Sequence, residues 1–271
     1  LGQAGGPWRG RVGSHLQRCG AFSAAMRVGL QLQPELKRVP GDLPGVLWEA
    51  LDVHDAEQVE HLVAYCLFVT VRALPAMSRA WWSEADRRDA LALERFVEKK
   101  VGPALVRHEV AMVRAAAAAG RWGTDSLVVR GSAATGEITA SYTIDETSIA
   151  MLIRLVKGYP FKNVEVECTS RLGISEKRWR RWVLQIVQLL SQQDGSVCDA
   201  VELWKKGIDK EIDGVEPCVI CYSTVHNPSL KLPSVECPTC HNRFHKSCVY
   251  QWIKTSGKSN CVLCQQPLFS N

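Results

Sequence analysis

The chain has 271 residues, with 33 Lys and Arg against 28 Asp and Glu, which gives a formal net charge of +5. At roughly 100–200 residues a domain, this length predicts two or three domains and excludes a mini-protein that lacks an ordinary core. No apolar run reaches the roughly 18 residues of a membrane span, so we expect a soluble protein without membrane contact. Because the sequence starts with Leu1 in a glycine-rich run, we expect it to be the C-terminal part of a longer protein.

The N-terminal half divides into two predicted segments. Residues 1–39 are glycine-rich and predict a disordered or linker segment. Residues 40–125 place apolar side chains at helical spacing over at least three long stretches, which we expect to break at Pro75 and Pro103. Stacked helices of this kind are typical of α-solenoids.

Residues 126–214 change to short β-branched runs separated by turn residues. They predict an antiparallel meander with strands at 126–130, 137–144, 148–154 and 163–170. Two amphipathic helices follow, with apolar stripes at three- and four-residue spacing: Trp179, Val183, Ile186 and Leu190, then Val201, Trp204, Ile208 and Ile212. Strands followed by helices predict an α+β domain.

The first of these two helices carries basic residues on its polar face, Arg178, Arg180 and Arg181. Such a cluster is suited to contact RNA phosphate, although a solvated helix face has the same composition. Both interpretations stay open at the level of the sequence.

Seven of the eleven cysteines fall between Cys218 and Cys264. With one histidine they form four consecutive pairs, each with two residues between its members: Cys218 and Cys221, Cys237 and Cys240, His245 and Cys248, Cys261 and Cys264. A two-residue gap lets a tight turn aim both side chains at one metal, and four S or N ligands close a tetrahedral zinc shell. Two zinc ions use all eight residues, whereas disulfides would leave one cysteine over and the histidine without a role.

This ligand order resembles the cross-braced zinc domains, which implies that the first and third pairs share one zinc and the second and fourth pairs the other. Two families have this order: the PHD finger, which reads histone tails, and the variant RING, which recruits a ubiquitin-conjugating enzyme. A PHD finger usually has an aromatic residue two positions before its seventh ligand, where this chain has Ser259. A RING has an apolar residue between its first two ligands and often a Trp four positions beyond the sixth. Ile220 and Trp252 match both, which favours RING.

The RING resemblance implies that Ile220, Trp252 and the last pair's turn line a shallow groove for the conjugating enzyme. Two residues of that turn depart from the pattern. Val262 stands where many RINGs have Pro, and Gln265 where many have Arg or Lys. Gln265 can hydrogen-bond but brings no charge to bridge the conjugating enzyme and its ubiquitin. Alternatively, Ile220 and Trp252 form the small core of the module.

Three stretches extend the resemblance beyond the zinc module: "LPAMSRAWWSEADR", "WRRWVLQIVQLLSQQDGSVCDAVELWKKGIDKEIDGVEPCVICYS" and "KSNCVLCQQPLF". Over about residues 40–271, this order of parts looks like the C-terminal end of the listerin family of ubiquitin ligases. The resemblance implies a multidomain chain: a HEAT-like solenoid end at 40–125, an RWD-like α+β domain at 126–214 and a RING-type zinc finger at 215–271. The RWD fold is related to ubiquitin-conjugating enzymes but lacks their catalytic cysteine.

The listerin family works in ribosome-associated quality control in the cytosol. The resemblance therefore implies three kinds of partner, which are a ubiquitin-charged conjugating enzyme, the large ribosomal subunit with its quality-control factors, and rRNA, touched by the arginine cluster. The conjugating enzyme would perform the covalent chemistry on stalled nascent chains, so we expect no catalytic residue in this chain. The alternative is a non-catalytic zinc-dependent binding module, either a PHD-like peptide reader or a structural scaffold.

Overall fold

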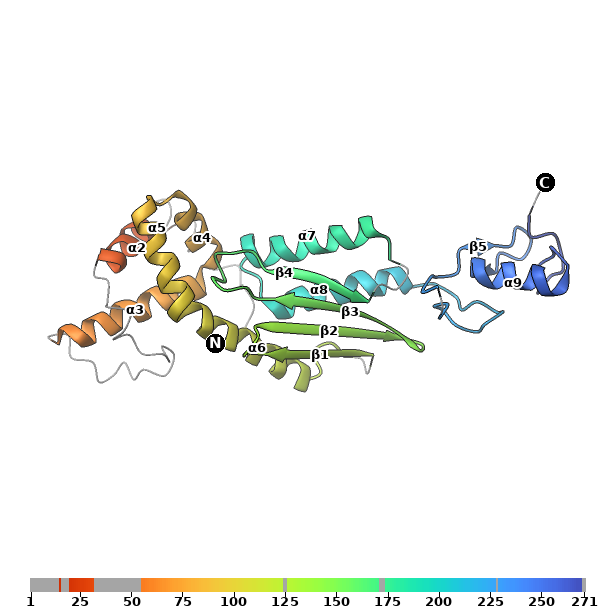
Figure 1. The fold of residues 1–271 in the computed structure, drawn as a ribbon, viewed down its shortest axis with the longest axis horizontal. Helices are drawn as coiled ribbons and strands as arrows, with labels where there is room; N and C mark the ends of the chain where they lie inside the picture. The colour runs from red at the N-terminus through yellow and green to blue at the C-terminus, as the bar shows by residue number, and fades with distance from the viewer. Residues whose placement is uncertain are drawn as a thin grey trace.

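The computed structural model describes residues 15, 20–31, 55–123, 126–170, 174–227 and 229–269. These residues form an elongated molecule with a helical end, a central four-stranded sheet covered by long helices, and a small cysteine-rich module at the opposite end (Figure 1). Residues 32–39 of the predicted linker and residues 40–54 of the predicted helical region lie outside the described residues.

The helical end begins with α2 (Ala21–Gln31), followed by α3 (Ala56–Ala73) and α4 (Pro75–Glu84). Helix α2 lies inside the segment 1–39, for which the sequence predicts a linker, and the prediction is wrong for these residues. Phe22, Met26 and Leu30 recur every four residues and are buried in the core that also holds residues of α3. This apolar stripe explains why the segment is helical despite its glycine-rich surroundings.

The next three elements form a continuous helical run: α5 (Arg87–Phe96), the π-helical turn η3 (Val97–Val101) and α6 (Gly102–Ala118). The predicted break at Pro103 is therefore wrong. In a regular α-helix a proline ring collides with the carbonyl four residues earlier and cannot donate a hydrogen bond. Here the backbone N–H of Gly102 donates to the carbonyl of Val97, five residues back, and this wider turn accommodates the proline.

The sheet is an antiparallel meander in the order β1 (Leu127–Ser132), β2 (Glu137–Ile144), β3 (Thr147–Arg154) and β4 (Glu165–Ser170). The strand predictions are confirmed to within two residues at each end. Alternate residues of β3, namely Ile149, Met151 and Ile153, are fully buried, so one face of the sheet packs on the helices.

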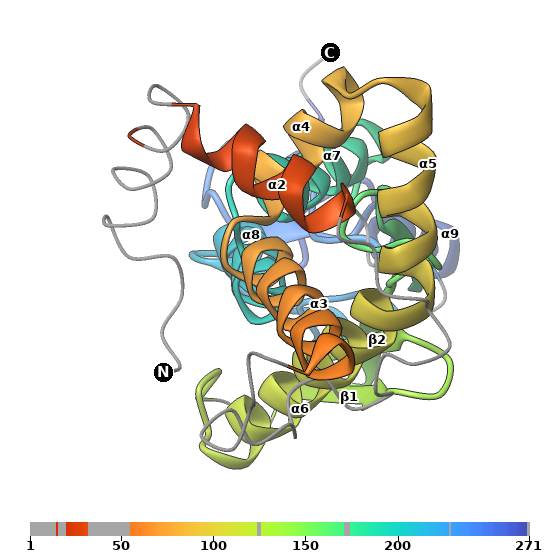
Figure 2. The ribbon, with the colours of Figure 1, turned by 90° about the vertical axis from the view of Figure 1, so that its left-hand side faces the viewer.

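Helices α7 (Glu176–Gln192) and α8 (Val197–Ile212) follow the sheet and pack against each other. Helix α6 packs against both β1 and α8, and Figure 2 shows it beside β1 when the molecule is seen from the helical end. Helix α6, which precedes the domain boundary predicted at residue 125, is thus in contact with the α+β domain that follows it. Gly207 in α8 lets the ring of Trp182 in α7 approach, since a Cβ there would lie 2.8 Å from it.

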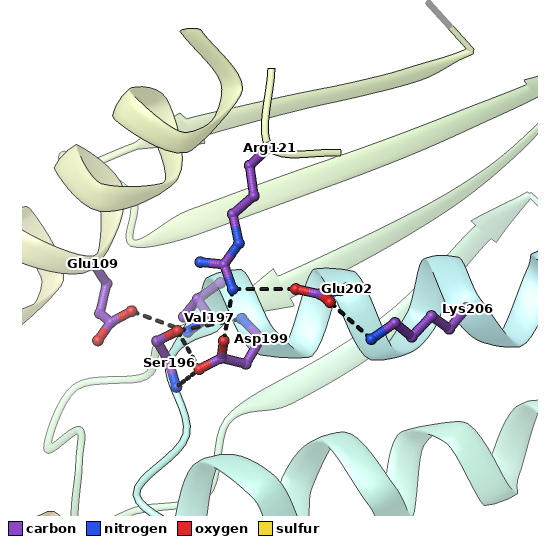
Figure 3. A network of polar contacts seen from close by, with 7 residues as sticks. All are labelled: Glu109, Arg121, Ser196, Val197, Asp199, Glu202 and Lys206. Carbon is purple, nitrogen blue, oxygen red and sulfur yellow. Dashed lines mark hydrogen bonds and ion pairs between the residues drawn. The ribbon is translucent and has the colours of Figure 1, made fainter. Parts of the chain in front are cut away.

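The N-terminus of α8 is the centre of the polar network in Figure 3. Ser196 and Asp199 cap the helix reciprocally, each side chain accepting from the backbone N–H of the other. Arg121, just beyond α6, donates to Asp199 (2.9 Å) and Glu202 (3.1 Å). The buried carboxylate of Glu109 in α6 accepts the backbone N–H of Val197 at 3.0 Å. The network thus joins the helical end to the α+β domain.

Among the described residues, no single helix is long and apolar enough to span a membrane. Only Gln58–Ala73 and Pro75–Glu84, taken together as a pair bent by 107°, meet that requirement by length and composition.

We expect Glu109→Ala to lower the free energy of unfolding by about 1–3 kcal/mol, because the buried N–H of Val197 loses its acceptor. Glu109→Gln keeps an acceptor and removes a buried charge. Burial raises the pKa of Glu109, so the folded protein holds this proton more tightly than the unfolded chain. The free energy of unfolding of the wild type therefore falls as the pH rises from the pKa of Glu109 in the unfolded chain to its higher pKa in the folded protein.

The test is the thermal midpoint of all three proteins between pH 4 and pH 8. The thermal midpoint of the Gln variant should match that of the wild type near pH 4 and should equal or exceed it near pH 8. The midpoint of the Ala variant should be the lowest of the three at every pH. Equal midpoints for Ala and Gln at every pH would contradict the role of the acceptor.

Candidate metal centre

The first cluster of metal-ligating side chains contains Cys218, Cys221, His245 and Cys248, whose ligand atoms all lie within 4.8 Å of one another. The first two cysteines follow α8, which ends at Ile212. His245 is the N-cap of α9 (Lys246–Ser256), and Cys248 lies in the first turn of that helix. The Nδ1 atom of His245 is 3.3 Å from the Sγ of Cys221 and 3.8 Å from the Sγ of Cys248. A tetrahedral zinc site with usual bond lengths has an N-to-S edge of about 3.6 Å.

The second cluster contains Cys237, Cys240, Cys261 and Cys264. The first pair lies between the short strands β5 (Val235–Glu236) and β6 (Arg243–Phe244), and the second pair follows α9. The Sγ atoms of Cys237 and Cys264 are 3.6 Å apart, and those of Cys240 and Cys261 are 3.7 Å apart. A disulfide needs about 2.05 Å, whereas the sulfur-to-sulfur edge of a tetrahedral Zn(Cys)₄ site is about 3.8 Å. The spacing is therefore that of metal ligands.

The three Cys-x-x-Cys turns share one backbone geometry. The residue after each second cysteine is left-handed: Tyr222, His241 and Gln265 have φ of 56°, 59° and 60°. Its N–H donates to the carbonyl of the first cysteine, at 2.7, 2.9 and 3.0 Å respectively. Non-glycine residues adopt this conformation rarely, so its threefold recurrence marks a turn shaped to aim two thiols at one point.

The surroundings of two ligands, His245 and Cys240, favour the form that binds metal. The Nε2–H of His245 donates to the carbonyl of Thr224 at 3.1 Å, which leaves Nδ1 unprotonated and facing the three thiols. Burial lowers the pKa of His245, and the neutral imidazole is the form that binds metal. Hydrogen bonds from the backbone and side chain of Asn242 lower the pKa of Cys240 to about 6, which favours the thiolate. Each cluster thus has the donors to hold one metal ion in a closed shell without an open catalytic position.

The residues predicted to bind a conjugating enzyme lie on three segments of this module. Ile220 belongs to the first turn, Trp252 to α9, and Val262 and Gln265 to the last turn. Gln265 is exposed and the other three are partly exposed. The Nε1–H of Trp252 donates to the carbonyl of Asn260 at 3.1 Å, which fixes the ring.

Ile220 packs against the small core of the module, whose buried members are other residues. Phe244, Val249 and Leu268 are buried there with the cysteines. Leu263 is 49% exposed beside Val262 and was not predicted, because the sequence does not show which residue of the turn faces solvent.

The predicted RNA-contacting arginines differ in their surroundings. Arg178 pairs with Glu211, and Arg180 pairs with Glu176 at 3.1 Å. Arg181 is exposed and lines a groove of about 560 Å³ between α7 and α8.

Two further described cysteines lie in the α+β domain. Cys168 is partly buried on β4, and Cys198 is buried at the start of α8, where burial raises the pKa of its thiol to about 11. Such a thiol stays protonated near neutral pH and is a poor nucleophile. Cys198 therefore does not offer an exposed thiolate.

Comparison with known proteins assigns families to two parts of this fold. Residues 127–211, which cover the sheet and both following helices, match the family described as ubiquitin conjugating domain-like. Residues 45–114 match the LTN1 family HEAT repeat region. These matches agree with the predicted α+β and HEAT-like parts.

Similarity to curated proteins covers most of the chain. It is 35% identical to the E3 ubiquitin-protein ligase listerin of Xenopus tropicalis over 213 residues, 79% of this chain and 12% of that protein. The chain is homologous to a segment of listerin. The mouse listerin is 35% identical over 78% of this chain, and the Saccharomyces cerevisiae listerin 33% over 78%, again covering only 12% and 14% of those proteins. The chain therefore spans about one eighth of the length of its listerin relatives.

We expect the purified chain to hold two metal ions. Cys248→Ser and Cys261→Ser should each retain about one, because each removes one thiolate from a different four-ligand shell. Metal per chain is measured by mass spectrometry after gel filtration. Cys66→Ser, at an exposed cysteine of α3, is the control that should keep both ions. Loss of both ions from either ligand variant would mean that the two sites do not fill independently.

Proposed function

We propose that this chain is the RING-type ubiquitin ligase region of a listerin-like protein, with one zinc ion in each cluster. Its cysteine-rich module binds a ubiquitin-charged conjugating enzyme and promotes transfer of the ubiquitin. The observation that carries this proposal is the interleaving of the ligand pairs. The first and third pairs converge on one site, and the second and fourth on the other, which is the cross-brace that RING domains share with PHD fingers. Ile220 and Trp252 match the RING pattern, and Ser259 stands where a PHD finger has an aromatic residue, so the RING is favoured.

The cross-brace explains how so small a module could hold a docking surface. Metal binding, on the order of 10 kcal/mol for each structural zinc, stabilises a segment whose core has only a few apolar side chains. Two interlocked sites fix the first turn, α9 and the last turn relative to one another. Ile220, Trp252 and Val262 come from these three segments and are free to contact a partner with their exposed parts.

The chain would contribute position rather than a nucleophile. The metal sites are closed, so ubiquitin would remain on the cysteine of the conjugating enzyme until an amine attacks it. Holding the thioester in one reactive geometry accelerates that attack without covalent chemistry on the ligase. Gln265 is exposed at the last turn and offers a neutral amide for this purpose.

The proposed substrate and place of action are those that the resemblance to the listerin family implies. We propose that the chain acts in the cytosol on stalled nascent chains at the large ribosomal subunit, with quality-control factors as further partners. Of the arginines expected at rRNA, Arg181 is the best candidate, because the charges of Arg178 and Arg180 are offset by Glu211 and Glu176.

The central test is single-turnover discharge of ubiquitin from a charged conjugating enzyme to free lysine. Wild type should accelerate discharge, and Ile220→Ala and Trp252→Ala should each reduce the rate about tenfold or more, as expected for an interface hot spot. Both variants should retain two zinc ions. Leu184→Ala, at an exposed position of α7, is the matched control. No acceleration with any of a panel of conjugating enzymes would favour a PHD-like reader or a scaffold.

A second prediction concerns the missing charge of the last turn. Gln265→Arg should raise the discharge rate about fivefold, because a hydrogen bond from a charged donor contributes about 1 kcal/mol more than one from a neutral amide. Gln266→Arg, at the neighbouring exposed position, is the control for added charge. An equal gain from both variants would indicate general electrostatic attraction rather than a specific bridge.

A further inference from the structure

The β2–β3 hairpin of the ubiquitin conjugating-like domain reaches the cysteine-rich module (Figure 1). Its two-residue turn contains Asp145, which has the left-handed φ of 51°. The Oδ2 atom of Asp145 accepts the backbone N–H of Thr224 at 2.8 Å and that of Val225 at 3.3 Å. One carboxylate oxygen thus binds two consecutive amides of the loop between the second and third metal ligands.

The same loop is anchored in the domain by apolar contact. Val225 is 2% exposed and belongs to the core of the sheet and helices, not to the small core of the module. Leu230 and Leu232, partly buried, pack against that larger core as well. The loop is therefore a segment of the metal-binding module whose apolar side chains pack on the core of the neighbouring domain.

The other side of the loop is tied to the metal site. The carbonyl of Thr224 accepts the Nε2–H of His245, whose Nδ1 faces the first cluster. A continuous series of contacts therefore runs from Asp145 through the backbone of Thr224 to a metal ligand. Each contact is a hydrogen bond of ordinary length, which is directional in a way that apolar burial is not.

The covalent connection between domain and module is short. Helix α8 ends at Ile212, and the first ligand is Cys218. A single short linker would still allow the module to rotate about it, whereas a second attachment at a distance from the first removes that freedom.

We propose that Asp145 is a positioning residue, which fixes the direction in which the module presents a bound conjugating enzyme relative to the ubiquitin conjugating-like domain. The claim that Asp145 fixes the orientation of the module does not depend on ligase activity. The claim that this orientation affects ubiquitin transfer rests on the proposed function. When this orientation is fixed, the thioester of the bound enzyme has one position relative to the domain and the helical end. Its position is then also fixed relative to any partner that these two parts bind.

The test measures orientation directly in the full 271-residue chain. Spin labels on p-acetylphenylalanine at positions 184 and 250, both highly exposed, report the distance between α7 and α9 by double electron–electron resonance. Asp145→Gly removes the carboxylate while tolerating the left-handed turn. Asp145→Asn keeps an oxygen acceptor in a residue that also tolerates it. Glu146→Gly is the control in the same turn.

Wild type, Asp145→Asn and Glu146→Gly should give one narrow distance distribution, and Asp145→Gly should broaden it at least about twofold. An unchanged distribution for Asp145→Gly would overturn the proposal, as would equal broadening by Glu146→Gly.

Zinc content and discharge to free lysine separate this proposal from the proposed function. Both should be unchanged in Asp145→Gly, because free lysine reaches the thioester from any direction. A loss of zinc or of discharge in that variant would mean that Asp145 acts on the integrity of the module instead, which also overturns the proposal. Failure of the wild type to discharge ubiquitin would contradict the ligase assignment and leave the distance measurement valid.

Discussion

Where two parts of this molecule meet, a carboxylate from one part accepts a backbone N–H of the other. Three such bonds span segments far apart in the sequence: Asp194 to Ala76 at the start of α4 (2.8 Å), Glu109 to Val197 at the start of α8, and Asp145 to Thr224 in the module. Each satisfies an amide at a helix start or in a loop that regular secondary structure leaves without an acceptor. The helical end, the sheet and the cysteine-rich module are thereby held in one arrangement, and the placement of the candidate docking surface depends on it.

Features encoded over short spacings were predictable from the sequence. The ligand pairs need only two intervening residues, so Cys218 with Cys221 and its counterparts could be recognised without knowledge of the fold. The strands and the two helices after them have strict apolar periods, which is why their bounds agree closely with the structure. The sharing of metals by alternate pairs came from family resemblance, since spacing alone does not determine it.

Features that depend on distant contacts were not predictable. Helix α2 is stabilised by burial of Met26 and its neighbours in a core built by other helices, which its glycine-rich sequence does not reveal. The π-turn before Pro103 lets a helix continue where a local rule predicts its end. The packing of α6 on β1 and α8, across the boundary predicted at residue 125, likewise depends on contacts between distant elements. The pairing of Arg178 with Glu211, from the following helix, is also a distant contact.

The burial of Val225 has a consequence for the autonomy of the module. In the sequence, the fifteen residues between Cys221 and Cys237 are only an interval between ligands. In the structure, part of that interval belongs to the core of another domain. A module excised at Cys218 would fold around its metals but expose Val225, Leu230 and Leu232 to water, with their cover removed. If the module is transferred to another protein, the domain that carries the hairpin should therefore be transferred with it. A fusion protein that contains the zinc-binding module alone would expose an apolar loop, which favours aggregation.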